Sequence, residues 1–154
     1  MIARFPDQLE EALAQSQTVS LHKHSAPIRS VLISGLGGSG IGGNFVQELV
    51  RAECKAPITV SKGYHAPRWV NKNTLAICSS YSGNTEETLS TFEQLLGTGA
   101  KIVVVSSGGK LIELAKKHGL DYVQLPGGWS SPRACLGYSV VAQLAVLRSA
   151  RLIS

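Results

Sequence analysis

The chain has 154 residues, which is the size of one ordinary domain and too short for two full domains. Hydrophobic residues make up 44% and charged residues 16%, a composition typical of a chain that folds around a core rather than of a disordered one. The formal net charge is +5 without a run of like charges, and aromatic residues are only 6%, so a nucleic-acid partner is disfavoured.

The first predicted elements are a helix, a loop and a strand. Residues 7–17 have the apolar spacing of a short amphipathic helix, with Asp7 as candidate N-cap and Glu10 as the second residue of a capping box. A loop over 22–27 follows, and 31–33 is predicted to be a buried strand that leads into a run of glycines.

The remaining elements continue this alternation of strands and helices. Five short strands share an apolar character on both faces, and they cover 31–33, 58–60, 74–78, 101–105 and 122–125. Later helices show apolar residues at helical spacing, and they cover 42–52, 85–96, 109–118 and 134–149. Such strands are typical of a parallel sheet with helices on both sides. The predicted fold is α/β, a doubly wound three-layer αβα sandwich with a five-stranded parallel sheet, in a single domain over 1–154.

The cysteines and the N-terminus indicate a compartment. Cys54, Cys78 and Cys135 are far apart and form no CxxC pair, which favours a reducing, cytoplasmic setting. The first residues lack the apolar stretch of a signal peptide, and no apolar run approaches the roughly 20 residues of a membrane span. We therefore expect a cytoplasmic protein without membrane contact.

A glycine-rich loop follows the first predicted strand. Gly35, Gly37 and Gly40 match the G-x-G-x-x-G spacing of a dinucleotide-binding turn. Such a site needs an acidic residue about 20 residues further on, at the end of the second strand, and none is there. Lys62 could meet a 2′-phosphate instead, so an NADP-binding domain stays an alternative. The other alternative is a turn that only lets strand and helix pack closely.

Hydroxyl and amide side chains cluster after the third predicted strand, just before a helix; they are Ser79, Ser80, Ser82, Asn84 and Thr85. The unpaired N–H groups and the positive dipole end of that helix point into the same space, which makes an anion site suited to phosphate. Simple N-capping by Ser82 or Asn84 is the alternative, although capping needs only one such residue.

Three segments resemble a known family. The sequence SYSGNTEET over 80–88 resembles the phosphate loop of SIS (sugar isomerase) domains. The sequence GLGGSGIGG over 35–43 resembles the opening loop of one branch, the bifunctional phosphoglucose/phosphomannose isomerases, and the segment 132–139 is similar to one typical of that branch. The resemblance covers nearly the whole chain.

The resemblance implies that the chain binds a phosphorylated sugar, most simply a hexose 6-phosphate, without a metal or redox cofactor. The phosphate would be held by groups of two loops, namely Gly37, Gly38, Ser39, Ser80, Ser82 and Thr85. Arg133 would stabilise the enediolate-like charge at C1–C2 as the catalytic residue of this domain. A surface salt bridge is the alternative for Arg133.

The chain also departs from the family, whose enzymes contain two such domains. The carboxylate that moves the proton and the histidine that opens the ring come from beyond the matching domain. Local substitutes are Glu86 and Glu87, which otherwise form a solvated helix start, and His65, which otherwise is a loop histidine. We therefore expect a binder that needs a second half or partner chain for turnover, with a non-catalytic sugar-phosphate sensor as the alternative.

Subunit contacts follow from the last predicted helix. Residues 134–149 are apolar over more than one stripe, which indicates burial against another domain or subunit, so we expect a homodimer or pairing with a second SIS chain. Trp69 and Trp129 lie in loops and could pack at such a contact or over a ligand. His22 and His24 alternate without further ligands, which is weak evidence for a metal.

Overall fold

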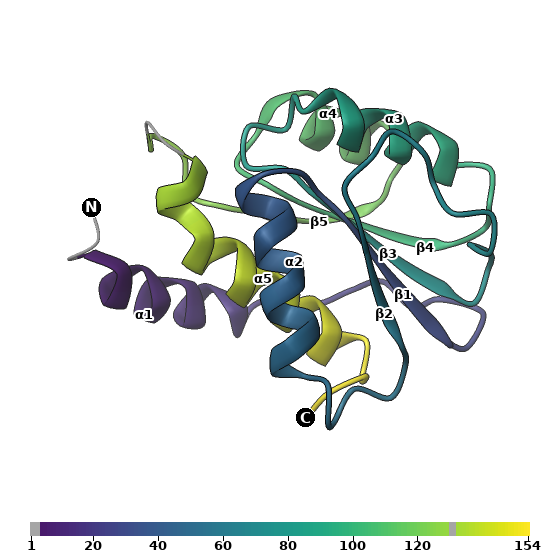
Figure 1. Ribbon diagram of the computed structural model, residues 1–154, viewed down its shortest axis with the longest axis horizontal. Helices are drawn as coiled ribbons and strands as arrows, with labels where there is room; N and C mark the ends of the chain where they lie inside the picture. Colours follow the sequence, from purple (N-terminus) through teal and green to yellow (C-terminus); the bar gives the residue numbers. More distant parts are fainter. Residues whose placement is uncertain (1–3, 130–131) are drawn as a thin grey trace.

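The computed structural model describes residues 4–129 and 132–154 and contains one sheet of five parallel strands (Figure 1). These strands are β1 (Ser30–Ser34), β2 (Ile58–Ser61), β3 (Thr74–Ser79), β4 (Lys101–Ser106) and β5 (Asp121–Gln124). Their order is β2-β1-β3-β4-β5, and every neighbouring pair runs parallel. The predicted α/β fold with a five-stranded parallel sheet is confirmed.

Helices lie on both faces of the sheet. The helices are α1 (Phe5–Ser16), α2 (Gly38–Leu49), α3 (Glu86–Leu95), α4 (Gly109–Lys117), the short 3₁₀ helix η2 (Pro132–Cys135) and α5 (Leu136–Ser149). Figure 1 shows α3 and α4 together on one side of the sheet, and α1, α2 and α5 on the other. The three layers of the predicted sandwich are therefore present.

Alternate residues of the same strands fill the two cores. The core shared with α1, α2 and α5 contains the strand residues Val31, Ile33, Leu75, Ile77, Val103 and Val105. The core shared with α3 and α4 contains the strand residues Leu32, Ala76, Cys78, Ile102 and Val104. Successive side chains of a strand point to opposite faces, so a sheet covered on both faces needs continuous apolar runs. This explains why the strands lack polar alternation.

The first helix begins earlier than its predicted cap. It starts at Phe5, with Pro6 in its first turn and without a side-chain cap at Arg4, so the prediction that Asp7 caps it is wrong. Proline suits a first turn because its φ is already helical and its missing N–H costs no hydrogen bond there. Asp7 lies within that turn, where its negative charge still interacts favourably with the helix dipole.

The second helix also begins earlier, at Gly38 rather than at residue 42, and it ends at Leu49. Its glycines allow close packing, because a Cβ on Gly43 would stand 2.9 Å from Ile33 Cγ2. A Cβ on Gly42 would stand 3.4 Å from Ser139 Oγ in α5. The glycine run is therefore partly a helix pressed onto β1 and α5 rather than entirely a loop.

The last helix is covered within this chain. Figure 1 shows α5 alongside α1 and α2, and its buried side chains include Val141, Val146 and Leu147. The several apolar stripes of α5 thus pack against neighbouring helices and the sheet, and they give no reason of their own to expect a subunit contact. None of the helices in residues 4–129 and 132–154 is long and apolar enough to cross a membrane.

Candidate functional site

The loops that follow β1 and β3 lie side by side at one edge of the sheet. Ser34, at the end of β1, pairs in register with Cys78 of β3, and Ser79 pairs with Val105 of β4. The strands are parallel, so the loops after all of them leave from the same edge, where ligands of such sheets bind. The register therefore brings the two sequence-predicted loops together.

The loop after β3 is organised by its own hydroxyl groups. The buried Ser80 side chain accepts a hydrogen bond from the Gly83 N–H at 3.1 Å, and its Oγ lies 2.8 Å from Thr85 Oγ1. The exposed Ser82 side chain accepts a hydrogen bond from the Asn84 N–H at 3.1 Å. Three of the six residues predicted to hold the phosphate thus occupy one tight loop before α3.

The first turn of α3 is available to an anion. Thr85 is its N-cap residue, and no side-chain hydrogen bond caps it. Asn84 caps another helix instead, because its Oδ1 accepts a hydrogen bond from the Lys110 N–H of α4 at 3.0 Å. The alternative that Ser82 or Asn84 serves only to cap α3 is therefore wrong. Uncapped N–H groups at a helix N-terminus favour a bound anion.

The loop after β4 supports the loop over 80–85, and this supporting role was not predicted from the sequence. Gly83 and Gly109 adopt positive φ values of 73° and 68°. The Leu111 N–H donates to the Gly83 carbonyl at 2.9 Å, and the Ser107 N–H donates to the Tyr81 carbonyl at 3.0 Å. The signal was present, because the Ser-Ser-Gly-Gly sequence over 106–109 repeats the composition of the other strand ends at this edge.

The glycine-rich loop after β1 places its predicted residues at the start of α2. Gly37 is the N-cap with φ 58°, and Gly38 and Ser39 form the first turn. Ser39 is 7% exposed. A second helix N-terminus therefore opens at the edge that carries the loop over 80–85, and its backbone N–H groups add to the donors there.

Close backbone packing fixes the shape of this turn. A Cβ on Gly35 would stand 3.0 Å from the carbonyl oxygen of Ser79, and a Cβ on Gly40 would stand 2.8 Å from the carbonyl oxygen of Gly35. Only glycine fits such contacts without movement. The Lys62 side chain passes beside Gly40, with Cε 3.2 Å from that Cβ position, so its positive charge lies near the start of α2.

The candidate acid–base residues Glu86 and Glu87 of α3 lie beside the segment that contains Tyr64 and the third candidate, His65. Glu86 Oε2 lies 3.4 Å from Tyr64 Oη. The negative charge of Glu87, with some burial and the charge of Glu86, raises the pKa of the Tyr64 phenol. Gln94 and Ser90 bind the Tyr64 carbonyl at 2.7 and 2.9 Å, so this segment lies along α3. His65 is exposed beside it. These contacts suit a solvated helix start.

Two further predictions concern the segment before α5. The backbone of Arg133 lies in η2, but its side chain is outside the described part of the structure, so its predicted role stays a prediction. Trp129 packs within the chain, with its ring 6.4 Å from that of Tyr138 and the Arg4 guanidinium carbon 5.4 Å from its centroid. Trp69 is 42% exposed.

The Cys78 thiol is unsuited to act as a nucleophile, and the described residues form no metal centre. Burial raises the pKa of the Cys78 thiol to about 12, so this side chain at the end of β3 stays protonated at neutral pH. Within residues 4–129 and 132–154, no three side chains of the His, Cys, Asp and Glu types are grouped to hold a metal ion.

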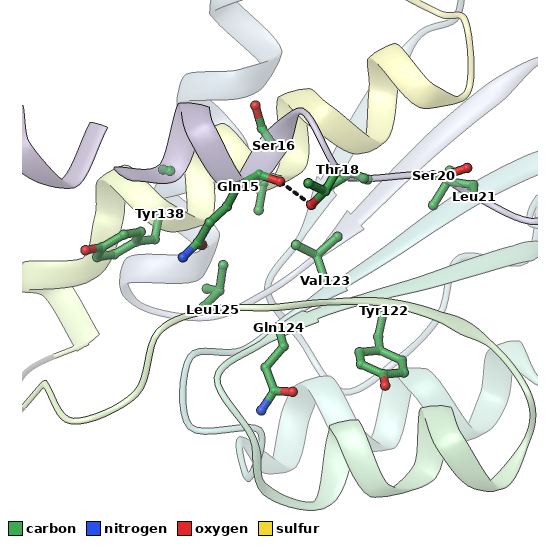
Figure 2. A pocket seen from close by; sticks show the side chains of 13 residues that line it. Gln15, Ser16, Thr18, Ser20, Leu21, Tyr122, Val123, Gln124, Leu125 and Tyr138 are labelled. Carbon is green, nitrogen blue, oxygen red and sulfur yellow. Dashed lines mark hydrogen bonds between the residues drawn. The ribbon is translucent and has the colours of Figure 1, made fainter. Parts of the chain in front are cut away.

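A separate cavity of about 280 Å³ lies between α1, α5 and β5 (Figure 2). Its lining includes Gln15 of α1, Tyr138 of α5 and Leu125 after β5. Figure 2 shows Thr18 beside Gln15, whose carbonyl accepts the Thr18 hydroxyl proton at 2.7 Å. None of the residues predicted to hold phosphate lines this cavity, so we assign the candidate site to the strand-end loops.

Solved structures with the same fold define the fold class of the chain. A protein of Clostridium difficile 630 assigned as a phosphosugar isomerase superposes with a TM-score of 0.76 at 17% identity, over 97% of this chain and 44% of that one. The Vibrio vulnificus NanR protein complexed with ManNAc-6P gives 0.58 at 14%, over 96% and 54%. The fold is that of phosphosugar isomerase (SIS) domains.

Curated relatives specify the branch, although no family model matches the chain. It is 43% identical over 143 residues to the bifunctional phosphoglucose/phosphomannose isomerase of Caldicellulosiruptor bescii, covering 93% of this chain and 42% of that protein. It is 39% identical over 134 residues to the protein of that name from Aquifex aeolicus, covering 86% and 42%. The chain is a homologue of the bifunctional phosphoglucose/phosphomannose isomerases, as its motifs indicated, and spans about two fifths of their length.

Proposed function

We propose that this chain, as a single SIS domain, binds a hexose 6-phosphate and forms one part of an aldose–ketose isomerase. The observation that carries the proposal is the loop of Ser80, Ser82 and Thr85 before the uncapped first turn of α3. Hydroxyl groups and free helix N–H groups in one short loop suit a phosphate dianion. The homology to phosphoglucose/phosphomannose isomerases supports the same ligand class.

The proposed reaction moves a proton between two sugar carbons. A base removes the C2 proton of the open-chain aldose to give an enediolate, a proton is returned to C1, and the hydroxyl proton passes from O2 to O1, which gives the ketose. The phosphate is held by the two loops, with Gly37, Gly38 and Ser39 closing the site, and the Arg133 guanidinium stabilises the negative charge on the oxygens at C1 and C2. Proton transfer and charge stabilisation need neither a metal nor a redox cofactor.

The base and the ring-opening acid are proposed to come from outside this chain. The relatives extend well beyond the part matched here, so a second domain or a second chain supplies these groups in our proposal. We propose a cytoplasmic homodimer, or a pair with a second SIS chain, without nucleic-acid or membrane partners. An exposed apolar stripe on α2 supports a dimer, because Ile41, Phe45 and Leu49 are 45%, 52% and 64% exposed.

A sugar-phosphate sensor is the second candidate. The favouring observation is that a NanR protein bound to ManNAc-6P shares the fold. The NADP alternative is weaker, because the position that would carry the ribose-binding acid holds Ser61 and Lys62. Titration of NADPH fluorescence with the chain separates this alternative from the other two.

The test is a coupled isomerase assay with fructose 6-phosphate, together with thermal stabilisation by the same ligand. We expect Ser82→Ala and Thr85→Ala each to weaken the affinity for the ligand about tenfold, because each variant loses a charge-assisted hydrogen bond. The thermal stabilisation by the ligand should fall accordingly. Arg133→Ala should reduce turnover, where turnover is seen, far more than binding. Ser25→Ala, an exposed serine in the loop before β1, is the control.

Each outcome decides between the candidates. Turnover that Arg133→Ala abolishes supports the isomerase, and stabilisation without turnover supports a binding half or a sensor. Equal losses of binding and turnover in all three variants would contradict the assigned roles. No stabilisation of the unsubstituted chain by fructose 6-phosphate would refute the proposed function.

A further inference from the structure

Tyr81 joins three loops at the ligand edge of the sheet. It lies between Ser80 and Ser82 in the proposed phosphate loop. Its carbonyl oxygen accepts hydrogen bonds from the Ser107 N–H at 3.0 Å and from the Ser107 hydroxyl at 2.5 Å. Its phenol donates to the Pro126 carbonyl at 3.1 Å and accepts from the Trp129 N–H at 3.3 Å. One residue therefore links the loops after β3, β4 and β5.

The phenol of Tyr81 also contacts the part of the chain that follows Arg133. The buried Cys135 side chain hydrogen-bonds to the same phenol. Trp129 stands four residues before Arg133 and Cys135 two residues after it. A single hydroxyl thus contacts the backbone before the arginine and the side chain after it, so its position constrains both ends of a short segment.

The contacts of this hydroxyl are persistent at neutral pH. Burial is the main cause that raises the pKa of the Tyr81 phenol, so the group stays protonated and keeps donating to the Pro126 carbonyl. The aromatic ring packs against the core formed with α1, α2 and α5. Phenylalanine at this position would keep that packing and lose only the hydroxyl contacts, so the two contributions can be separated.

We propose that Tyr81 is a positioning residue that sets the Arg133 segment relative to the phosphate bound by Ser80 and Ser82. The inference rests on the proposed function and adds a residue to it. A reacting sugar extends from its phosphate to C1–C2. The distance between the phosphate loop and the arginine segment therefore decides whether the arginine can stabilise the negative charge at C1–C2. Tyr81 belongs to the phosphate loop and contacts Trp129 directly, so it connects the two.

The test measures the binding of two ligands by calorimetry. Inorganic phosphate reports on the phosphate loop alone, and 5-phosphoarabinonate carries a carboxylate that mimics the enediolate. We expect Tyr81→Phe to bind inorganic phosphate within about twofold of the unsubstituted chain and 5-phosphoarabinonate about tenfold more weakly. That loss corresponds to 1.4 kcal/mol, the range of one hydrogen-bond contribution. In an Arg133→Ala background, Tyr81→Phe should have no further effect.

The matched control is Tyr138→Phe, because Tyr138 also contacts Trp129 but its phenol hydrogen-bonds to Glu11 of α1. We expect this variant to unfold more easily and to keep the ratio of the two affinities. Amide hydrogen exchange supplies a ligand-free readout: Tyr81→Phe should accelerate exchange over 127–129 and 133–135 and leave 80–85 unchanged.

The inference is overturned if Tyr81→Phe weakens both ligands equally. It is also overturned if Tyr81→Phe weakens 5-phosphoarabinonate as much without Arg133 as with it. A purely structural tyrosine would give either of these results. If the unsubstituted chain binds neither ligand, the proposed function fails first, and that outcome is distinct because it appears before any substitution is made.

Discussion

The carbonyl oxygen of Gly108 lies 1.9 Å from the point where a Cβ on Gly83 would stand. The two glycines belong to the loops after β4 and β3, so the backbones of these loops are in direct contact. Gly83 has a φ of 73°, a conformation that other residues rarely adopt. The shape of the proposed phosphate loop thus depends on the absence of one side chain.

Gly83→Ala is expected to distort this loop. The left-handed backbone alone costs an L-residue about 1–2 kcal/mol, and the contact with Gly108 forces the loop to move. We expect lower stability in urea and a loss of thermal stabilisation by fructose 6-phosphate. Gly97→Ala is the matched control, because a Cβ there meets nothing within 4 Å. Unchanged stability and ligand response in Gly83→Ala would contradict the argument.

The opposite edge of the sheet contains a buried ion pair. Asp121, at the start of β5, is 8% exposed and forms an ion pair with Lys101; its carboxylate also hydrogen-bonds to the His22 ring, and the His22 backbone N–H donates to its Oδ2 at 2.9 Å. Burial by itself raises the pKa of this carboxyl, but the hydrogen bond and charge of Lys101 and the donors of His22 outweigh it and lower the pKa overall. Folding therefore favours the ionised form.

The direction of this shift predicts an acid sensitivity. A carboxyl whose pKa is lowered by folding stabilises the protein above its unfolded pKa, near 4, and loses that contribution as pH falls through its folded pKa. We expect the free energy of unfolding to fall below about pH 4 and to fall less in Asp121→Asn. That variant should be less stable at pH 7 by about 3 kcal/mol, because Lys101 loses its partner.

The measurement is urea denaturation from pH 7 to pH 3. Asp7→Asn, in the exposed first turn of α1, is the control and should follow the pH profile of the unsubstituted chain. Parallel pH profiles for Asp121→Asn and the unsubstituted chain would show that the Asp121–Lys101 ion pair does not cause the acid sensitivity.

The outer face of α2 carries the apolar stripe of Ile41, Phe45 and Leu49. Residues four apart lie on the same face of a helix, so the three side chains form one row. Phe45→Glu is expected to weaken self-association at micromolar concentration, as measured by sedimentation velocity, and to change stability by no more than about 0.5 kcal/mol because the side chain is exposed.

Leu96→Glu is the control for this prediction. Leu96 follows α3 on the other side of the sheet and is 38% exposed, so it tests an apolar surface residue outside the stripe. A monomeric unsubstituted chain at tens of micromolar would refute the homodimer. A dimer that persists in Phe45→Glu would place the contact elsewhere.

Local patterns accounted for the elements and for the candidate loops. The apolar runs of the strands predicted a sheet buried on both faces, because an uninterrupted apolar run can be seen in the local sequence of each strand. The phosphate loop was predictable for a similar reason, because Ser80, Ser82 and Thr85 lie within one short stretch of sequence before a helix start. The start of α2 was not predictable from the sequence. A run of glycines indicates a loop, unless a neighbouring strand lies close enough to favour a helix there.

The sequence by itself determined the order of strands and helices, the α/β class and the chemical character of the two loops, because each depends on neighbours along the chain. Only the tertiary structure decided which segments meet: α5 against α1 and α2, Gly83 against Gly108, and Tyr81 against Pro126 and Trp129. These contacts join residues far apart in sequence, and packing in three dimensions, rather than local preference, selects them.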